Sequence, residues 1–279
     1  MPLPNYLVKK IPKLRNIRKI RRIIDDCHIN SVCESAKCPN IGECFSQNTL
    51  TFMILGDICT RHCRFCGVAK GSPLSVDPEE PQRIARAVKK LGLKYVVVTS
   101  VTRDDLADGG ASQFAEVLLQ LQTSNSALRT EVLIPDFQGN KAALQTVLAA
   151  KPFVLNHNIE TIPRLYLTIR PEAGFRRSLE LLSWVKRQKS SIYTKSGFMV
   201  GLGEKKEEIF DVLIELRSAG CDVVTIGQYL APTRAHFQVQ RFVEPDEFCE
   251  YESFGKKMGL KVFAGPFVRS SYRAGEIVK

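Results

Sequence analysis

The sequence predicts an α/β fold, and more closely a partial (β/α)6 TIM-type barrel. Two observations support this prediction. Short apolar segments alternate with amphipathic helical segments six times in succession, and such alternation indicates a parallel sheet with right-handed crossovers. Polar and cysteine residues also gather at or just after the ends of most predicted strands, which is how a βα barrel builds a site at one face.

The predicted strands are short, apolar and rich in β-branched residues, and turn residues bound them. The helices are predicted from their apolar periodicity and from residues typical of helix ends. The first has a proline near its start and Gly92 after its end, and the third has Asn140 as its predicted N-cap. Strands are predicted at 49–56, 94–101, 129–137, 153–160, 191–203 and 222–229, and helices at 78–91, 112–121, 140–150, 175–188, 205–218 and 245–258. Residues 260–267 add a last apolar segment.

Three regions follow from this reading. Residues 1–48 contain no strand-like run and form an N-terminal cysteine-bearing extension, residues 49–260 form the partial barrel, and residues 261–279 form a C-terminal tail. The extension and the tail would cover the missing side of the barrel. The residues expected at or just past the carboxyl ends of strands are Cys59, Thr99, Asp136, Asn156, His157, Lys195 and Gln228.

Composition narrows the class of protein. Hydrophobic residues make up 44% and charged residues 25% of the 279-residue chain, which is ordinary for a globular protein with a sizeable core. No apolar run approaches the roughly 20 residues needed to span a bilayer, so no membrane association is expected. Nine cysteines without a secretory signal indicate a reducing compartment, the cytoplasm by default, or a plastid or mitochondrial matrix if the chain is a mature form.

The net charge of +11 is concentrated near the N-terminus. This cluster is either a solvated face or a docking surface for an acidic partner, and charge alone does not decide between the two. Its members are Lys9, Lys10, Lys13, Arg15, Arg18, Lys19, Arg21 and Arg22.

Six of the nine cysteines lie between positions 33 and 66, in two groups of three. The spacing lacks the paired C-x-x-C halves of a structural zinc site. Thiolates in threes suit iron–sulfur clusters, because a four-iron cubane held by three cysteines keeps one iron open for chemistry. Two groups therefore predict two clusters. Cys221 and Cys249 are expected to be inert core thiols, and the role of Cys27 is left open.

The second group, Cys59-x3-Cys63-x2-Cys66 with Phe65 before the last cysteine, resembles the motif of the radical S-adenosylmethionine (SAM) enzymes. This resemblance implies a [4Fe–4S] cluster whose open iron binds SAM, and one-electron cleavage of SAM to a 5′-deoxyadenosyl radical. Phe65 would pack beside the bound ligand. Gly109 and Gly110 resemble the superfamily's glycine pair that contacts the methionine group, although Ala111 replaces the acid that usually follows.

The first group, Cys33-x4-Cys38-x5-Cys44, is similar to the auxiliary-cluster motif of the lipoyl synthases. Further blocks carry the resemblance over most of residues 30–275, among them VTSVTRDDLADGGA (98–111), LNHNIET (155–161) and VRSSY (268–272). It implies a second [4Fe–4S] cluster whose fourth ligand is Ser270 or, as we favour, Ser271. Arg269 would position the substrate or the dissociated serine.

The implied reaction inserts two sulfur atoms at C6 and C8 of an octanoyl chain on a carrier lysine, consuming two SAM and the auxiliary cluster. The implied partners are octanoylated lipoyl domains or the glycine-cleavage H protein, an electron donor such as ferredoxin or flavodoxin, and an iron–sulfur cluster carrier. The basic N-terminal segment would steer the acidic carrier. Some of Asn156, His157, Asn158 and Glu160 are expected to bind SAM or the substrate arm, although His157 alone suits a structural role.

Two rival functions were weighed. Another radical SAM sulfur-inserting enzyme would share the second cysteine group but has no equivalent role for the first. A basic, metal-stabilised nucleic-acid-binding protein would explain the charge, yet no recognition-helix motif or aromatic-rich basic sheet is present, so nucleic acid is not an expected partner.

Overall fold

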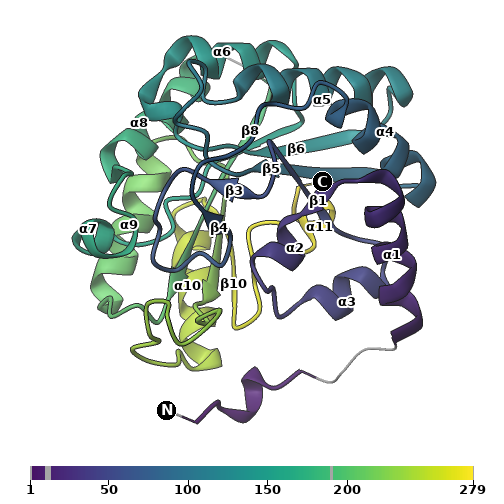
Figure 1. Cartoon of the computed structure of the whole chain (residues 1–279). Coiled ribbons are helices and arrows are strands. Elements are labelled where there is room, and N and C mark those ends of the chain that lie inside the picture. Colours follow the sequence, from purple (N-terminus) through teal and green to yellow (C-terminus); the bar gives the residue numbers. More distant parts are fainter. Residues whose placement is uncertain (1, 10–13, 189–190, 279) are drawn as a thin grey trace. The chain divides into compact units, whose positions relative to one another are not determined.

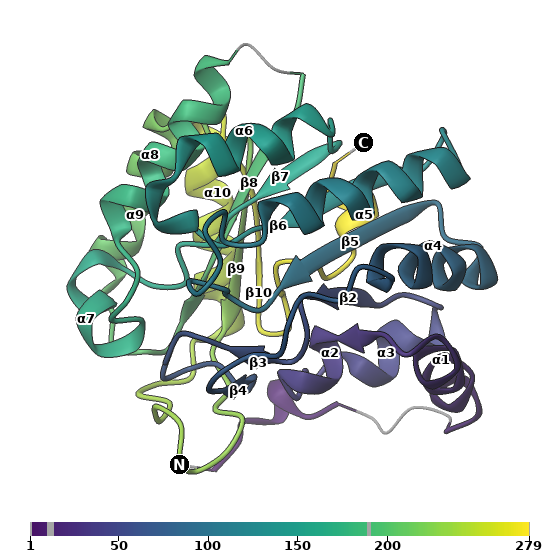
Figure 2. The ribbon, with the colours of Figure 1, turned by 45° about the horizontal axis from the view of Figure 1, so that its top comes forward.

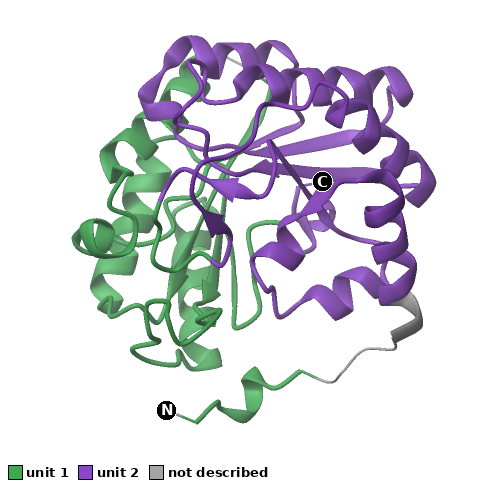
Figure 3. Cartoon of the chain, in the orientation of Figure 1, with its two compact units in different colours: residues 1–9, 62–66, 156–272 green, residues 10–61, 67–155, 273–279 purple. Residues whose placement is uncertain are grey.

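The computed structural model describes residues 2–9, 14–188 and 191–278, and it divides into two compact units (Figures 1 and 3). Unit 1 contains residues 1–9, 62–66 and 156–272, and unit 2 contains residues 10–61, 67–155 and 273–279. Each unit is described by itself below.

Unit 2 is built on three parallel strands, β2 (Thr51–Ile54), β5 (Tyr95–Ser100) and β6 (Arg129–Leu133). Thr51 pairs with Val97, and Tyr95 pairs with Arg129. Most of their side chains are buried, as expected for a parallel sheet covered on both faces. The short strand β7 (Val154–Asn156) ends at the boundary between the units.

Three helices follow these strands, α4 (Glu80–Leu91), α5 (Ala111–Ser124) and α6 (Lys141–Ala149), and Figure 2 shows α4 and α5 alongside β5. The predicted end signals are confirmed. Gly92 adopts a left-handed conformation at the end of α4, and the Asn140 side chain accepts hydrogen bonds from the first backbone N–H groups of α6. Two short helical elements of unit 2 are the 3-10 helix η2 (Phe137–Gly139) and, near the C-terminus, α11 (Ala274–Ile277).

The N-terminal part of unit 2 is mainly helical, with α1 (Leu14–Cys27), α2 (Val32–Ser35) and α3 (Ile41–Ser46). The expectation that residues 1–48 contain no strand was wrong. β1 (Asn30–Ser31) pairs antiparallel with β2, and the Ser31 hydroxyl donates to the Thr51 carbonyl at 3.1 Å. Two residues are too few to leave an alternating pattern in a sequence.

A second small sheet was also missed. β3 (Ile58–Cys59) pairs in parallel with β4 (Ala69–Lys70), so Cys59 lies in a two-residue strand where a loop was expected. The two strands are exposed or half-buried, which gives them no apolar signal in the sequence.

Unit 1 holds the parallel strands β8 (Tyr193–Val200), β9 (Val223–Gln228) and β10 (Lys261–Gly265). The helix that joins β8 to β9 buries an apolar face that includes Ile209 and Val212. The helical elements of this unit are η1 (Asn5–Leu7), η3 (Pro163–Leu165), α7 (Tyr166–Ile169), α8 (Phe175–Arg187), α9 (Lys206–Ser218) and α10 (Pro245–Lys257).

Two details of the strands differ from the prediction. Lys195 is the third residue of β8 and does not lie at its carboxyl end. The strand predicted at 153–160 is shorter, because β7 stops at Asn156 and only Glu160 makes a further bridge, to Phe198. Residues 157–159 are not part of a strand, and Glu160 itself has a positive φ of 64°.

The strands and helices together form an α/β fold with a mostly parallel sheet, consistent with the predicted partial barrel. Across the described ranges, no helix combines the length and the apolar character needed to cross a bilayer.

Candidate functional site

The first cysteine of the second group is held by the segment that follows β5. The backbone N–H of Thr102 donates to Cys59 Sγ at 3.3 Å. The Thr60 N–H and hydroxyl both donate to the Thr102 carbonyl at 3.0 Å, and the N–H of Asp104 donates to the Thr60 hydroxyl at 3.1 Å. The backbone around Cys59 is therefore fixed to residues 102–104 by main-chain and hydroxyl contacts.

Arg61, inside the same motif, is buried. Its guanidinium binds Asp104 through two hydrogen bonds, of 2.6 and 2.9 Å, and Asp136 through a third of 2.6 Å. The Asp136 side chain is fully buried and also accepts from the Gln138 N–H as the N-cap of η2. One guanidinium between two carboxylates is a rigid forked contact that lysine cannot reproduce.

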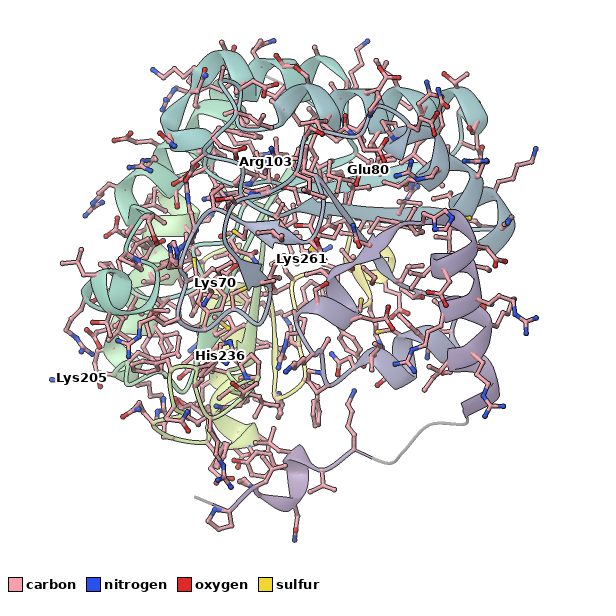
Figure 4. The ribbon with its side chains drawn as sticks, viewed as in Figure 1. Lys70, Glu80, Arg103, Lys205, His236 and Lys261 are labelled. Atoms are coloured by element: carbon pink, nitrogen blue, oxygen red, sulfur yellow. The ribbon has the colours of Figure 1, made fainter. Side chains whose placement is uncertain are left out.

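The other two cysteines of this group belong to unit 1, where α7 and the chain after β9 contact residues 64–66. The Arg64 N–H donates to the Ile169 carbonyl at 2.8 Å. His236, labelled in Figure 4, places Nε2 3.1 Å from the Cys66 carbonyl oxygen. Burial, together with the charge of Cys66, raises the pKa of Tyr229 to about 12. Cys63, Phe65 and Cys66 themselves are half-buried and therefore accessible to a ligand.

The predicted glycine pair lies where α5 begins. Gly110 has a φ of 89°, and a Cβ there would lie 2.2 Å from Leu55 Cδ1, so a larger residue is excluded both by conformation and by space. Burial alone would raise the pKa of Asp108, but hydrogen bonds from Ser112 and from the Gly110 N–H hold it below its ordinary value. A cavity of about 490 Å³ adjoins this turn, lined by Leu55, Val76, Pro78, Leu106, Asp108, Gly110, Ser112, Gln113 and Glu116.

The strand end that precedes Cys59 is supported from two sides. Leu55 has a positive φ of 68°, and the buried Glu80 carboxylate accepts its N–H at 3.0 Å. Gln113 donates to the same carboxylate at 2.9 Å, and Arg103 donates to the Leu55 carbonyl at 3.5 Å (Glu80 and Arg103 are labelled in Figure 4). Burial raises the pKa of Glu80 above its ordinary value.

The first cysteine group lies on α2, on α3 and in the turn between them. Ser31 is the N-cap of α2 and accepts from the Cys33 N–H at 3.3 Å, while the Cys38 N–H donates to the Cys33 carbonyl at 3.0 Å. Burial, and to a smaller degree the charge of Cys38, raises the pKa of the Cys33 thiol. Cys44 lies on α3 and is half-buried, as is Cys38.

The two serines of the terminal motif lie in different environments within unit 1. Asn156 Nδ2 donates to the Ser270 hydroxyl at 2.8 Å, and that hydroxyl donates to Asn158 Oδ1 at 2.8 Å. Among the residues that the structure describes, the Ser271 hydroxyl has no hydrogen-bond partner. Arg269 donates to the Val268 carbonyl at 2.7 Å. The amide of Asn156, expected to bind a cofactor, thus contacts Ser270 here.

Asn158 continues this chain of contacts. Its Nδ2 donates to Glu160 Oε1 at 3.0 Å, and Arg170 donates to the Asn158 carbonyl at 2.8 Å. Burial raises the pKa of Glu160 although Arg170 opposes the shift. His157 is buried with Nε2 2.9 Å from the Ser178 hydroxyl, an environment typical of a structural histidine.

The remaining cysteines divide. Cys221 is buried, and this burial raises its pKa to about 12, as expected for an inert thiol. The prediction for Cys249 was wrong, because its side chain is exposed on α10 while its neighbours Phe248 and Tyr251 face inward. Cys27 is buried.

The donor sets fit iron–sulfur clusters. All nine cysteines lie in described parts of the chain and none is in a disulfide, and five of the six in the two groups are half-buried. In the described ranges no three His, Cys, Asp or Glu side chains converge on the position of a single metal ion. A cluster has no such requirement, because its thiolates bind separate irons.

Comparison with protein families defines the class. The model of the radical SAM superfamily matches residues 53–216, more than half of the chain. This range includes the second cysteine group and the glycine pair.

Curated relatives specify the family. The lipoyl synthase of Caldicellulosiruptor saccharolyticus is 51% identical over 277 residues, covering 99% of this chain and 97% of that protein. Those of Caldanaerobacter subterraneus and Aquifex aeolicus are 53% and 50% identical, over 97% of this chain and 95% and 98% of theirs. The chain belongs to the lipoyl synthase family of radical SAM enzymes.

Solved structures agree on the fold alone. Streptococcus suis SuiB bound to S-adenosylmethionine aligns with a TM-score of 0.61 at 12% identity, over 81% of this chain and 54% of that one. HydG, a maturase of the [FeFe]-hydrogenase, aligns with a TM-score of 0.61 at 12% identity, over 95% of this chain and 68% of that one.

Sequence reasoning missed the residues that hold the site in place, Arg61 and Thr102 above all. A signal for Arg61 was present: acidic residues lie near or just past the ends of two predicted strands, at Asp136 and Asp104, and buried carboxylates need a cation. Thr102 acts through its backbone N–H, which carries no residue-specific signal.

Proposed function

We propose that this chain inserts two sulfur atoms, at C6 and C8, into an octanoyl chain attached to a lysine of a carrier protein. The observation that supports this most is the presence of two separate groups of three cysteines that form no disulfides, in a member of the lipoyl synthase family. One group suits radical generation and the other suits sulfur donation. The rival reading as a nucleic-acid-binding protein has no support from the relatives, whose names are those of an enzyme.

We assign Cys59, Cys63 and Cys66 to the first cluster. When bound, this cluster and SAM supply the one-electron chemistry that unactivated C–H bonds require, since no side-chain base can deprotonate them. Phe65, half-buried between two of the cysteines, would shield the ligand from water. The turn at Gly109 and Gly110 offers backbone groups at close approach, held in place by Asp108.

Cys33, Cys38 and Cys44 would hold the auxiliary cluster, and Ser271 would supply its fourth ligand. The Ser271 hydroxyl, which has no hydrogen-bond partner within the described ranges, supports this choice over Ser270, whose hydroxyl is engaged with two asparagine amides. A serine oxygen is a harder and poorer iron ligand than a thiolate. Its bond is therefore the one expected to break when the cluster gives up sulfur, and Arg269 would then bind the released serine or the substrate.

The octanoyl carrier would be an acidic lipoyl domain or glycine-cleavage H protein, and the basic residues near the N-terminus would steer it. On α1, Arg18, Lys19 and Arg22 are exposed, whereas Arg21 pairs with Glu34 at 2.9 Å. Lys10 and Lys13 lie outside the described residues, as does the side chain of Arg15. A ferredoxin or flavodoxin would supply electrons, and a cluster carrier would rebuild the auxiliary cluster, in a reducing compartment such as the cytoplasm.

Charge substitution on α1 tests the steering. Ile20 on this helix is fully buried, so deleting the segment would damage the fold, and Arg18→Gln with Arg22→Gln is the cleaner change. We expect a higher KM for the carrier at low salt and a flatter salt dependence, because fewer charges attract it. Lys89→Gln with Lys90→Gln on α4 removes the same charge from exposed positions and is the matched control. Equal KM values for the two double variants would argue against steering by α1.

The function itself is tested by anaerobic single-turnover mass spectrometry. The reconstituted protein is mixed with SAM, dithionite and an octanoyl-lysyl peptide. We expect two 5′-deoxyadenosines per dithiolated product, and loss of the product when Cys33, Cys38 and Cys44 are changed to Ala. Formation of 5′-deoxyadenosine without sulfur transfer by the unchanged chain would refute the assigned substrate and leave the radical site standing.

A further inference from the structure

Arg61 occupies an unusual place for a charged residue. It lies between Cys59 and Cys63 in the sequence, yet its side chain is only 3% exposed. The exposed fractions of its partners differ, at 25% for Asp104 and 0% for Asp136. A guanidinium taken out of water needs such partners, and its planar fork satisfies both carboxylates at once.

The forked contact connects Arg61 to the hydrogen bond on the Cys59 sulfur. Asp104 is two residues beyond Thr102, whose N–H lies 3.3 Å from Cys59 Sγ. Thr60 joins both ends of this short segment, through the Thr102 carbonyl and the Asp104 N–H. Moving Asp104 would therefore move the Thr102 amide relative to the sulfur.

Hydrogen bonds to the sulfur ligands are one of the features that set the reduction potential of an iron–sulfur cluster. An N–H that donates to a thiolate withdraws electron density from the sulfur, which favours the reduced cluster and raises its potential. The direction of a backbone N–H does not depend on the side chain of its own residue. It depends on the contacts that hold the backbone on either side of it.

We propose that Arg61 is a positioning residue that holds residues 102–104 against residues 59–61, aims the Thr102 amide at the Cys59 sulfur, and thereby sets the potential of the cluster. This inference rests on the assignment of Cys59 as a cluster ligand. Asp136 anchors the Arg61 guanidinium, because its side chain is fully buried and is also held as the N-cap of η2.

The test compares Arg61→Lys with Arg64→Lys. Both residues lie in the same cysteine segment, and both changes keep the charge. The Arg64 side chain is exposed, however, and its Cζ lies 5.6 Å from the centre of the Phe237 ring. Asp104→Asn is a second variant that weakens the same fork from the partner's side. Thermal unfolding of each metal-free variant verifies that it folds.

Two readouts separate positioning from a general structural role. In the metal-free protein, amide hydrogen exchange at Thr102 should become roughly tenfold faster in Arg61→Lys and Asp104→Asn, because about one hydrogen bond is lost. In the reconstituted protein, a redox titration followed by EPR should give a more negative midpoint potential for both variants than for Arg64→Lys, at equal iron content.

Unchanged exchange at Thr102 and an unchanged potential in Arg61→Lys would overturn the inference. Failure of the underlying assignment would look different. In a chain where Cys33, Cys38 and Cys44 are already Ala, adding Cys59→Ala would then leave the iron content unchanged. An exchange effect that appears in Arg64→Lys to the same extent would also refute the role of Arg61.

Discussion

Gly227 on β9 provides a strong test of how the terminal motif is placed. A Cβ at this position would lie 2.0 Å from the Val268 carbonyl oxygen and 3.1 Å from Arg269 Nη1. Contacts below 3.0 Å are essentially never seen for a real Cβ, so in Gly227→Ala the Val268 carbonyl must move by about 1.0 Å. The atom that must move belongs to the backbone, and no side-chain rotation can relieve the contact.

The expected effect follows from that displacement. Misplacing a reacting group by about 1 Å can lower a rate by about 100-fold, and Ser271 lies three residues beyond Val268. Lipoyl formation in Gly227→Ala should therefore fall about 100-fold, while overpacking lowers the free energy of unfolding by about 1–3 kcal/mol. SAM cleavage should persist, because the first cluster's cysteines are untouched. Mass spectrometry of 5′-deoxyadenosine and of the dithiolated peptide in one reaction measures both.

Gly265 is the matched control, because it pairs with Gly227 across β9 and β10. Its Cβ would meet only the Val268 side chain, at 3.3 Å from Cγ2, and a methyl group can shift. Gly265→Ala should keep lipoyl formation within about threefold of the unchanged chain. If Gly227→Ala made lipoyl product at the control's rate, close packing of the terminal motif on β9 would have no part in sulfur transfer.

Three further predictions concern single groups. Ser271→Ala should lose sulfur transfer and part of the auxiliary iron, whereas Ser270→Ala should mainly lose stability, by about 1–2 kcal/mol for its hydrogen bonds; iron analysis and urea unfolding decide. The Arg164 guanidinium holds the pKa of Glu208 at about 2, below the 4.5 of an unperturbed glutamate. Its contribution to stability is thus present above pH 4.5 and lost as the pH falls toward 2, and Glu208→Gln should flatten that part of the unfolding profile. Cys221, with its pKa near 12, should resist iodoacetamide at pH 8 until denaturant is added; modification in the folded state would contradict its burial.

Much of the fold could be predicted because the strands of this protein are apolar and its helices carry end signals. Asn140 and Gly92 act through local chemistry that the sequence shows directly. β1 and the pair β3 and β4 could not be predicted, since two-residue strands are defined by their partners and not by a pattern of their own. Lys195 was misplaced because the predicted range of 191–203 did not fix where the strand begins and ends; β8 extends from Tyr193 to Val200, so Lys195 lies near its start.

For the candidate site, the cysteine spacing supplied the proposed ligands, and the structure supplied the contacts that hold some of them in place. The sequence favoured Ser271 through the family resemblance, but local composition shows no physical difference between the two terminal serines. Their difference comes from Asn156 and Asn158, more than a hundred positions away in the chain, whose amides occupy the Ser270 hydroxyl. Long-range contacts of this kind leave no trace in local composition.

The pairing of β1 with β2 has a consequence for the exposure of β2. β2 is an almost fully buried apolar strand, and β1 occupies the backbone groups along one of its sides. Removing residues 1–48 would leave those groups open, and an unpaired apolar strand is a template for association with other chains. The segment that carries three of the proposed cluster ligands therefore also covers a strand that would otherwise be open to association with other chains.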